Sequence, residues 1–150
     1  LHYPPRGVRS FGPRRPVLRY GANYIKAASE SIVSLAMIET QLGLENLDDI
    51  VRVEGIDGVF IGPTDLALAL GREPLADSSD PLVVDTISMI RQRAHAAGKR
   101  VGIFCAGSKF ARAKIDEGFD LVSVMPDLSA LVSSARSVLS EMRLSSAGGE

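Results

Sequence analysis

Two acidic residues each follow an apolar run of the sequence, and their spacing is the first sign of chemistry. Glu39 comes directly after the run 32–38, and Asp65 comes four residues after the next run, past a Gly-Pro turn. If both runs are parallel strands, their carboxyl ends meet at one edge of a sheet. Two neighbouring carboxylates repel unless a proton or a cation lies between them, and Mg²⁺ or Mn²⁺ suits oxygen ligands. The spacing raises the hypothesis of a metal site, while a simple helix-start role for either acid stays open.

Strands must alternate with helices to position these acids. Nearly continuous apolar runs predict buried parallel strands at residues 32–38, 58–61, 101–104 and 121–124. Helical spacing and helix-boundary residues predict helices at 24–31, 42–51, from the Gly-Pro turn to about 70, 81–98, 108–118 and 127–142. Four such units fit either a doubly wound sheet or a segment of a (β/α)8 barrel. The sequence has neither a G-x-G-x-x-G nor a G-x-x-x-x-G-K-[ST] motif, which favours the barrel over a nucleotide-binding or effector-binding domain.

The domain organisation follows from the same pattern. Residues 1–23 hold several Pro-bearing turns without periodicity, so we expect an irregular N-terminal segment that docks against the rest. Residues 24–143 are expected to form the partial barrel domain. Residues 144–150 are rich in Ser and Gly and are expected to be a disordered tail.

Composition narrows the classes of partner. The chain has 150 residues, 45% of them hydrophobic, which fits one globular domain. Its 17 basic and 18 acidic residues give a formal charge of -1 without blocks of one sign, so no nucleic-acid partner is expected. No apolar stretch reaches the length of a membrane span and nothing resembles a signal peptide, so we expect a soluble, cytoplasmic protein without membrane contact.

A long motif contains both acids and resembles one family. It comprises Met37-Ile38-Glu39-Thr40, Leu44-Glu45-Asn46-Leu47 and residues 53–66 (VEGIDGVFIGPTDL), with Tyr3-Pro4-Pro5-Arg6-Gly7 near the start. From Tyr3 to about Met142 the chain resembles the HpcH/HpaI aldolase/citrate lyase family. More narrowly, it is similar to the 2-keto-3-deoxyglucarate and 2,4-dihydroxyhept-2-enedioate aldolases. The resemblance implies the C-terminal part of a TIM barrel, about four β-α units, with the N-terminal strands absent.

The resemblance also implies an activity and its residues. It implies a class II pyruvate aldolase that cleaves or forms a 2-keto-3-deoxy (4-hydroxy-2-oxo) acid, giving pyruvate and an aldehyde through a metal-stabilised enolate. The implied metal ligands are Glu39 and Asp65, holding Mg²⁺ or Mn²⁺. The implied substrate-binding residues are Gly62, Pro63, Thr64, Asp65 and Leu66. Among these, the backbone N–H groups of Thr64 and Asp65 would receive the pyruvate carboxylate, and Leu66 would line the aldehyde side.

Some features depart from the family pattern. Met37 stands where many members carry a Gln, which removes a hydrogen-bonding group near the substrate. The family His that transfers a proton and the Arg that steadies the enolate oxygen belong to the absent strands, so the catalytic residues are unknown. His2 and His95 do not match those positions. An alternative is therefore an inactive barrel fragment that retains divalent-metal or oxo-acid binding. We expect a homo-oligomer.

The remaining candidates have simpler interpretations. Arg6 is expected to border the pocket or a subunit contact. His95, near the end of a helix, is expected to interact with the helix dipole or to face water. Cys105 is expected to be a small buried residue, and Asp127 a helix N-cap.

Overall fold

A four-stranded parallel sheet forms the centre of the protein. The structure, a computed structural model, describes residues 1–12 and 14–147. Its strands are β1 (Leu35–Ile38), β2 (Gly58–Ile61), β3 (Arg100–Phe104) and β4 (Leu121–Ser123), paired in the order β1-β2-β3-β4. Each strand is parallel to its neighbour, and the order never reverses along the sheet. Sequential order is the pattern of a (β/α)8 barrel, whereas a doubly wound sheet has a reversal point. The predicted fold, a partial barrel of four β-α units, is confirmed.

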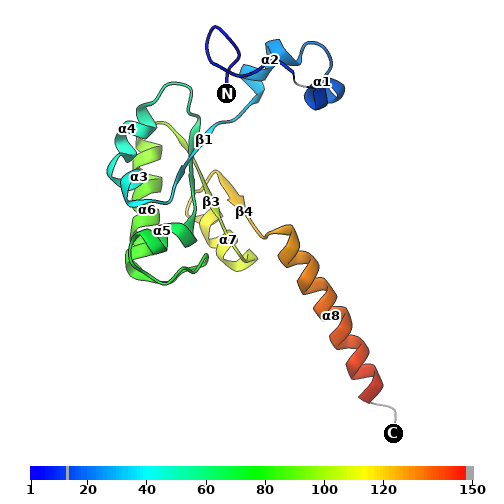
Figure 1. The fold of residues 1–150 in the computed structure, drawn as a ribbon. Coiled ribbons are helices and arrows are strands. Elements are labelled where there is room, and N and C mark those ends of the chain that lie inside the picture. Colours follow the sequence, from blue (N-terminus) through cyan, green and yellow to red (C-terminus); the bar gives the residue numbers. More distant parts are fainter. Residues whose placement is uncertain (13, 148–150) are drawn as a thin grey trace.

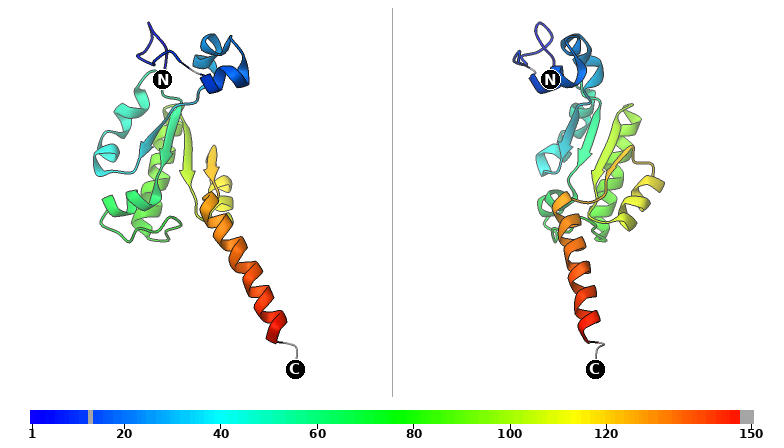
Figure 2. Two further views of the ribbon diagram at one scale, coloured as in Figure 1. Left: turned by 45° about the vertical axis from the view of Figure 1, so that its right-hand side comes forward. Right: turned by 90° about the vertical axis from the view of Figure 1, so that its right-hand side faces the viewer.

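Helices connect the strands and extend from both ends of the sheet. The connecting helices are α3 (Gln41–Glu45), α4 (Leu47–Arg52), α5 (Pro63–Ala69), α6 (Pro81–Ala96) and α7 (Ser108–Asp116). Before β1 come α1 (Arg14–Tyr20) and α2 (Tyr24–Ser31), near the end of the sheet at which the strands begin (Figure 1). After β4, helix α8 (Asp127–Ala147) projects away from the opposite end as a separate rod (Figure 2). None of the helices in the described ranges is long and apolar enough to cross a membrane.

The hydrophobic core lies between one face of the sheet and the connecting helices. Ile38, Ile61 and Ile103 each have no exposed surface and pack in one cluster with the inner faces of the helices. Full burial of a side chain of this size contributes about 1.5–3 kcal/mol. The other face of the sheet is open, because Met37 is 54% exposed and Leu121 is 51% exposed. The strands therefore have one buried and one accessible face.

The first strand is shorter than its apolar run. Pairing begins at Leu35 instead of Ile32, and Val33 is exposed. Ser34 explains the limit, since its backbone N–H donates to Asp57 Oδ2 at 2.6 Å and its hydroxyl donates to the Gly55 carbonyl at 2.6 Å. The Ser34 backbone hydrogen bond is the main reason why the pKa of Asp57 lies below its ordinary value. These bonds anchor the loop before β2 and leave no strand pairing for the residues upstream.

The helix predicted at 42–51 is divided in two at Asn46. This residue ends α3 and begins α4, and its side-chain amide donates to the Leu42 carbonyl at 2.8 Å. Asn side chains compete with the backbone for such bonds and favour helix ends over helix interiors. The apolar periodicity continues through the break, so the sequence pattern did not reveal it.

Both terminal segments are more regular than predicted. Segment 1–23 contains α1, in which Pro16 is the third residue. A Pro is tolerated there because the first turn of a helix has no intrahelical partners for its N–H groups. At the other end, α8 continues to Ala147, which lies within the segment 144–150 that was predicted as a tail. Residues 148–150 of that tail lie outside the described part of the chain.

Asp120 joins three elements at the end where the strands begin. Its carboxylate accepts from Arg100 Nη1 at 2.7 Å and from the Val101 N–H at 2.9 Å, and it contacts His95 Nε2 at 2.9 Å. His95 lies in the last turn of α6, where a basic ring interacts favourably with the helix dipole as expected, and its ring also contacts this carboxylate, which was not predicted. Partial burial would raise the pKa of Asp120, but the bonds from His95, Val101 and Arg100 outweigh it and lower the pKa to about 2.

We expect Asp120→Asn to lower the free energy of unfolding by about 1–3 kcal/mol near pH 5, because hydrogen bonds to a charged group are lost or weakened. A lowered pKa stabilises the fold above the unfolded value of 3.8, and this stabilisation is lost as the pH falls toward about 2. The difference between wild type and variant should shrink across that interval in urea unfolding curves. Asp116→Asn, which removes only a surface i,i+4 pair, is the control and should cost under about 0.5 kcal/mol. An equal effect of both variants would contradict the role of Asp120.

Candidate active site

Four residues that lie at or directly after the carboxyl ends of the four strands form a row. Ile38 pairs with Ile61, and Ile61 pairs with Ile103, so the three buried side chains lie in register. Successive residues of a strand point to opposite faces. Glu39, Gly62 and Phe104, which follow these three residues, therefore turn toward the open face, and Ser123 joins them because it pairs with Phe104. We call Glu39, Gly62, Phe104 and Ser123 the strand-end row.

Within this row, the Glu39 carboxylate lies directly over Gly62. A Cβ atom added to Gly62 would overlap Glu39 Oε2 and would lie 3.4 Å from Glu39 Cβ. The backbone of Gly62, with φ -97° and ψ 92°, is open to any residue, so conformational freedom does not require glycine here. The close approach of the carboxylate requires it. The structure thus brings together two residues that the sequence predicted for one site.

Helix α5 starts beside this carboxylate with free backbone donors. Gly62 is its N-cap and provides no side-chain cap, Pro63 has no N–H, and the first helical bond runs from the Leu66 N–H to the Gly62 carbonyl. The N–H groups of Thr64 and Asp65 therefore precede the first intrahelical bond and lack partners within the helix. The predicted role of these two N–H groups, binding of a carboxylate, is compatible with this geometry and stays a prediction.

Glu39 and Asp65 fit a divalent ion by their chemistry. Glu39 is half-buried and Asp65 is exposed in the first turn of α5. Among the residues that the structure describes, neither carboxylate has a hydrogen-bond or ion-pair partner. The described chain also contains no group of three or more His, Cys, Asp or Glu residues placed for a metal. Mg²⁺ is commonly coordinated by one or two protein carboxylates, and water and substrate oxygens complete its coordination shell. Two carboxylates therefore suit this ion.

Two of the predicted site residues lie elsewhere. The side chain of Leu66 has no exposed surface and belongs to the hydrophobic core, so the expectation that it lines the aldehyde side is wrong. Arg6 lines a cavity of about 210 Å³ with Ser34 and Asp57, near the beginning of β1 and β2. That cavity is at the opposite end of the strands from Glu39. Pro63 is buried beneath the site and starts α5, where it fixes the position of the helix.

Phe104 and Ser123 were not predicted as site residues. Each follows a residue of the core face, and strand alternation alone would have found them once the register was known. Met37 lies on the same open face, two residues before Glu39, and pairs with Phe60. The Phe60 ring in turn lies against Gly102, where an added Cβ would be 2.6 Å from Phe60 Cδ2. The surface behind the strand-end row is therefore apolar.

Cys105 follows Phe104 but points into the core, as predicted. Its side chain has no exposed surface, and burial, followed by the nearby charge of Asp77, raises the pKa of the thiol to about 11. A thiol with that pKa stays protonated near neutral pH and is a poor nucleophile.

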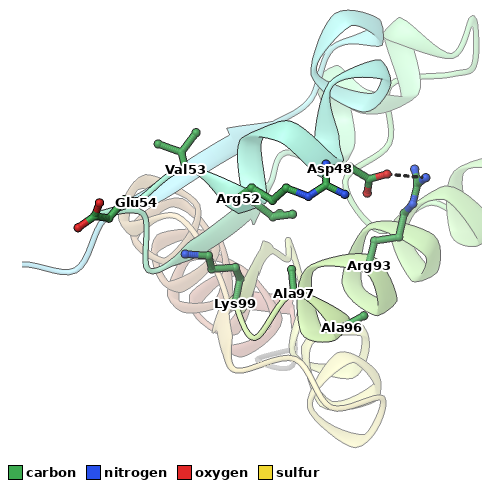
Figure 3. A pocket seen from close by; sticks show the side chains of 9 residues that line it. Asp48, Arg52, Val53, Glu54, Arg93, Ala96, Ala97 and Lys99 are labelled. Carbon is green, nitrogen blue, oxygen red and sulfur yellow. Dashed lines mark hydrogen bonds and ion pairs between the residues drawn. The ribbon is translucent and has the colours of Figure 1, made fainter.

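A separate hollow of about 680 Å³ lies between α4 and α6, at the end where the strands begin (Figure 3). Charged side chains of both signs line it, and Arg93 binds Asp48 across it at 3.0 Å. Chemistry in parallel α/β proteins occurs beyond the carboxyl ends of the strands, so this hollow is not part of the strand-end site.

A sequential parallel sheet with acidic residues and a helix start at its carboxyl ends defines a protein of the (β/α)-barrel class. The sequence model of the HpcH/HpaI aldolase/citrate lyase family matches residues 1–134, and the chain belongs to this family. The predicted family is confirmed.

Relatives of known name agree with this assignment. The chain is 61% identical over 143 residues to the hydroxypyruvate/pyruvate aldolase of Rhizorhabdus wittichii, covering 95% of this chain and 57% of the relative. It is 38% identical over 136 residues to the 5-keto-4-deoxy-D-glucarate aldolase of Salmonella paratyphi C, covering 89% of this chain and 52% of the relative. It is also similar to the crystal structure of a family protein from Burkholderia cenocepacia J2315, with a TM-score of 0.80 and 27% identity, covering 95% of this chain and 57% of that one. The chain thus spans about half the length of the curated relatives it matches.

If Glu39 is a metal ligand, as the sequence predicts, Gly62→Ala should weaken Mn²⁺ binding about 10–100-fold, because the added methyl group displaces the Glu39 carboxylate. Since Ala adopts the backbone angles of residue 62 without strain, the thermal midpoint should change little. Titration calorimetry and thermal unfolding of the same sample separate the two effects. Wild-type affinity in the variant would show that Glu39 is not held over residue 62.

Proposed function

We propose that this chain forms part of the active site of a metal-dependent aldolase. The reaction is cleavage or formation of a 4-hydroxy-2-oxo acid, with pyruvate or hydroxypyruvate and an aldehyde as the two parts. The observation that carries the proposal is the Glu39 carboxylate lying over Gly62, beside the free N–H groups of Thr64 and Asp65. The names of two relatives, a hydroxypyruvate/pyruvate aldolase and a 5-keto-4-deoxy-D-glucarate aldolase, support the same class of reaction.

Each residue of the site has a task that follows from its position. The N–H groups of Thr64 and Asp65 donate to the carboxylate of the oxo acid, and the dipole of the helix start favours its negative charge. The carboxylates of Glu39 and Asp65 would hold Mg²⁺ or Mn²⁺. When bound, such an ion supplies Lewis-acid polarisation of the 2-oxo group. Because Gly62 has no side chain, it leaves room for both the Glu39 carboxylate and the oxo acid.

A second candidate is binding of the oxo acid and metal without turnover by this chain. The position of the histidines favours it. His95 binds Asp120 where the strands begin, and His2 approaches Gly55 before β2. Neither ring lies at the Glu39 edge, so neither is placed to transfer a proton at the strand-end row. In this alternative the chain retains the half-site and an additional segment or subunit supplies the acid or base.

Calorimetric titration with Mg²⁺ and Mn²⁺, with and without pyruvate, tests the half-site that both candidates share. Pyruvate should tighten metal binding to the wild-type chain, because its carboxylate meets the N–H groups of α5 while its oxo group meets the ion. Glu39→Ala and Asp65→Ala should each abolish this enhancement. Glu45→Ala, an exposed acid of α3, is the matched control.

Absence of metal binding in the folded wild-type chain would overturn the proposed function. Enhanced binding accompanied by release of pyruvate from a 4-hydroxy-2-oxo acid would support the aldolase, and enhanced binding without release would support the second candidate.

We further propose that the protein is a homo-oligomer that assembles through α8. All side chains of residues 127–143 are exposed, and α8 projects from the body in both views (Figure 2). Its large apolar residues recur at helical spacing along one side, namely Leu128, Leu131, Val132, Val138, Leu139 and Met142. A stripe of three apolar positions in seven is typical of a helix that packs against a protein surface. A second copy of the chain, carrying the same stripe and an open sheet face, fits this surface.

The double variant Leu131→Glu/Val138→Glu should shift the protein from oligomer to monomer in light scattering after size exclusion, because two charges enter the apolar stripe. Ser133→Glu/Ser140→Glu adds the same charge to another side of α8 and should leave the oligomer intact. A wild-type protein that is monomeric at all accessible concentrations would contradict this assembly.

A further inference from the structure

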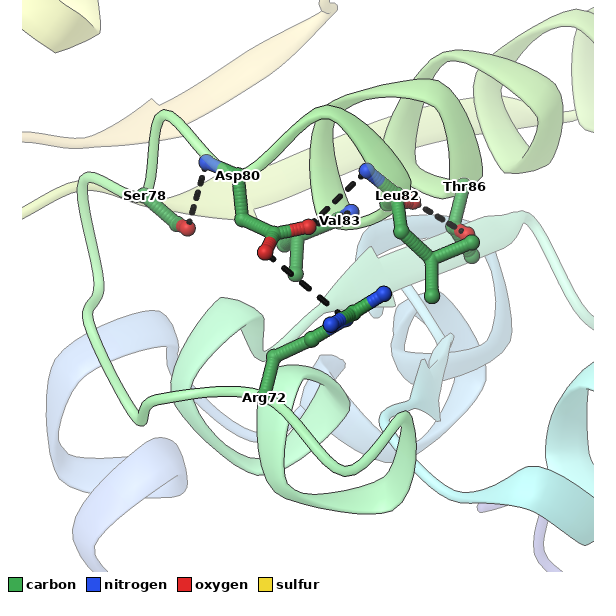
Figure 4. A network of polar contacts seen from close by, with 6 residues as sticks. All are labelled: Arg72, Ser78, Asp80, Leu82, Val83 and Thr86. Carbon is green, nitrogen blue, oxygen red and sulfur yellow. Dashed lines mark hydrogen bonds and ion pairs between the residues drawn. The ribbon is translucent and has the colours of Figure 1, made fainter.

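The segment between α5 and α6 passes beside the turn that follows β3. We call residues 71–80 the strap. At its start, the Arg72 N–H donates to the Ala67 carbonyl at 2.8 Å, which closes α5. At its end, Asp80 caps α6 by accepting from the Leu82 N–H at 2.9 Å, and the buried Ser78 hydroxyl accepts from the Asp80 N–H at 3.2 Å (Figure 4). Arg72 and Asp80 approach each other at 3.7 Å, so the two ends of the strap are joined.

Between these ends, Asp77 binds a different part of the chain. Its Oδ1 atom accepts from the Ala106 N–H at 2.8 Å. The other oxygen lies close to Gly107, where an added Cβ would be 3.3 Å from Asp77 Oδ2. The turn 105–107 is held from its other side by the Cys105 N–H, which donates to the Ser123 carbonyl at 2.8 Å. Asp77 therefore fixes the strap to the turn directly after Phe104.

This turn directly follows Phe104, so it adjoins the part of the strand-end row that is farther from Glu39. The row runs across the sheet as Glu39, Gly62, Phe104 and Ser123, because β1, β2, β3 and β4 are consecutive neighbours. The oxo-acid part of the substrate takes the Glu39 and Gly62 end under the proposed function. The remaining part of the substrate must then extend along the row toward β3 and β4 or away from the sheet.

We infer that Asp77 is a positioning residue of this site, which acts by holding the turn 105–107 and with it the β3 end of the strand-end row. The inference rests on the proposed function. Asp77 does not touch the oxo-acid end, where Glu39, Thr64 and Asp65 act. Its loss should therefore affect the aldehyde part of the substrate and leave the pyruvate part unchanged.

The strap offers matched variants for a test. Asp77→Ala removes the acceptor, whereas Asp77→Asn keeps an amide oxygen that can accept from the Ala106 N–H. Glu73→Ala removes another exposed carboxylate of the same strap and serves as the control. The measurements are KM and kcat for cleavage of 4-hydroxy-2-oxopentanoate, followed by release of pyruvate, and the affinity for pyruvate in the presence of Mn²⁺.

Asp77→Ala should raise KM about tenfold, the effect of losing one hydrogen bond, with kcat and pyruvate affinity unchanged. Asp77→Asn should restore KM, and Glu73→Ala should match the wild type. An unchanged KM in Asp77→Ala, or a parallel loss of pyruvate affinity that indicates general damage, would overturn the inference. Failure of the wild-type chain to cleave the substrate would overturn the aldolase proposal and this inference together, and would be seen before any variant is measured.

Discussion

The alignment of three buried isoleucines across the sheet determines most of what lies at its functional edge. Ile38, Ile61 and Ile103 are in register and have no exposed surface, so each strand reaches the carboxyl edge at the same level and with the same face in the core. A shift of one residue in any strand would turn its final side chain to the other face. The approach of Glu39 to Gly62 depends on this register, and the strap follows the same edge. The register of the strands thus determines both the packing of the core and the placement of the polar residues.

Much of this arrangement can be read from the sequence. The apolar runs located β2 to the residue and the other strands within a few residues, because runs apolar on both faces are typical of parallel strands. The acids after two neighbouring strands identified the edge of the sheet, and the long motif around them identified the family. Glu39 and Gly62 were predicted for one site and lie in contact. The confirmed predictions, those of the fold and the family, concern properties that are local or that strand order fixes.

The features that the sequence did not reveal depend on how the chain folds around each residue. Leu66 follows Asp65 in the motif, yet helical geometry turns its side chain into the core, which no linear spacing indicates. His95 meets Asp120, 25 positions away, and Ser34 meets Asp57, 23 positions away, so the role of each depends on tertiary structure. Phe104 and Ser123 carry no chemical signature and became visible only through the pairing of β3 with β4. Helix α1 was not predicted because the Pro residues of segment 1–23 were interpreted as turns.

The exposed stripe of α8 has a consequence for how the protein responds to dilution. At about 1.5 Å per residue, 21 residues extend the helix about 30 Å from β4. Most helical stability in proteins comes from packing of an apolar face and not from intrinsic helix propensity. No described side chain of α8 is buried against the rest of the chain, and in the proposed oligomer this packing comes from a second copy. In that assembly the order of this helix would be subject to mass action, rising and falling with the concentration of the protein.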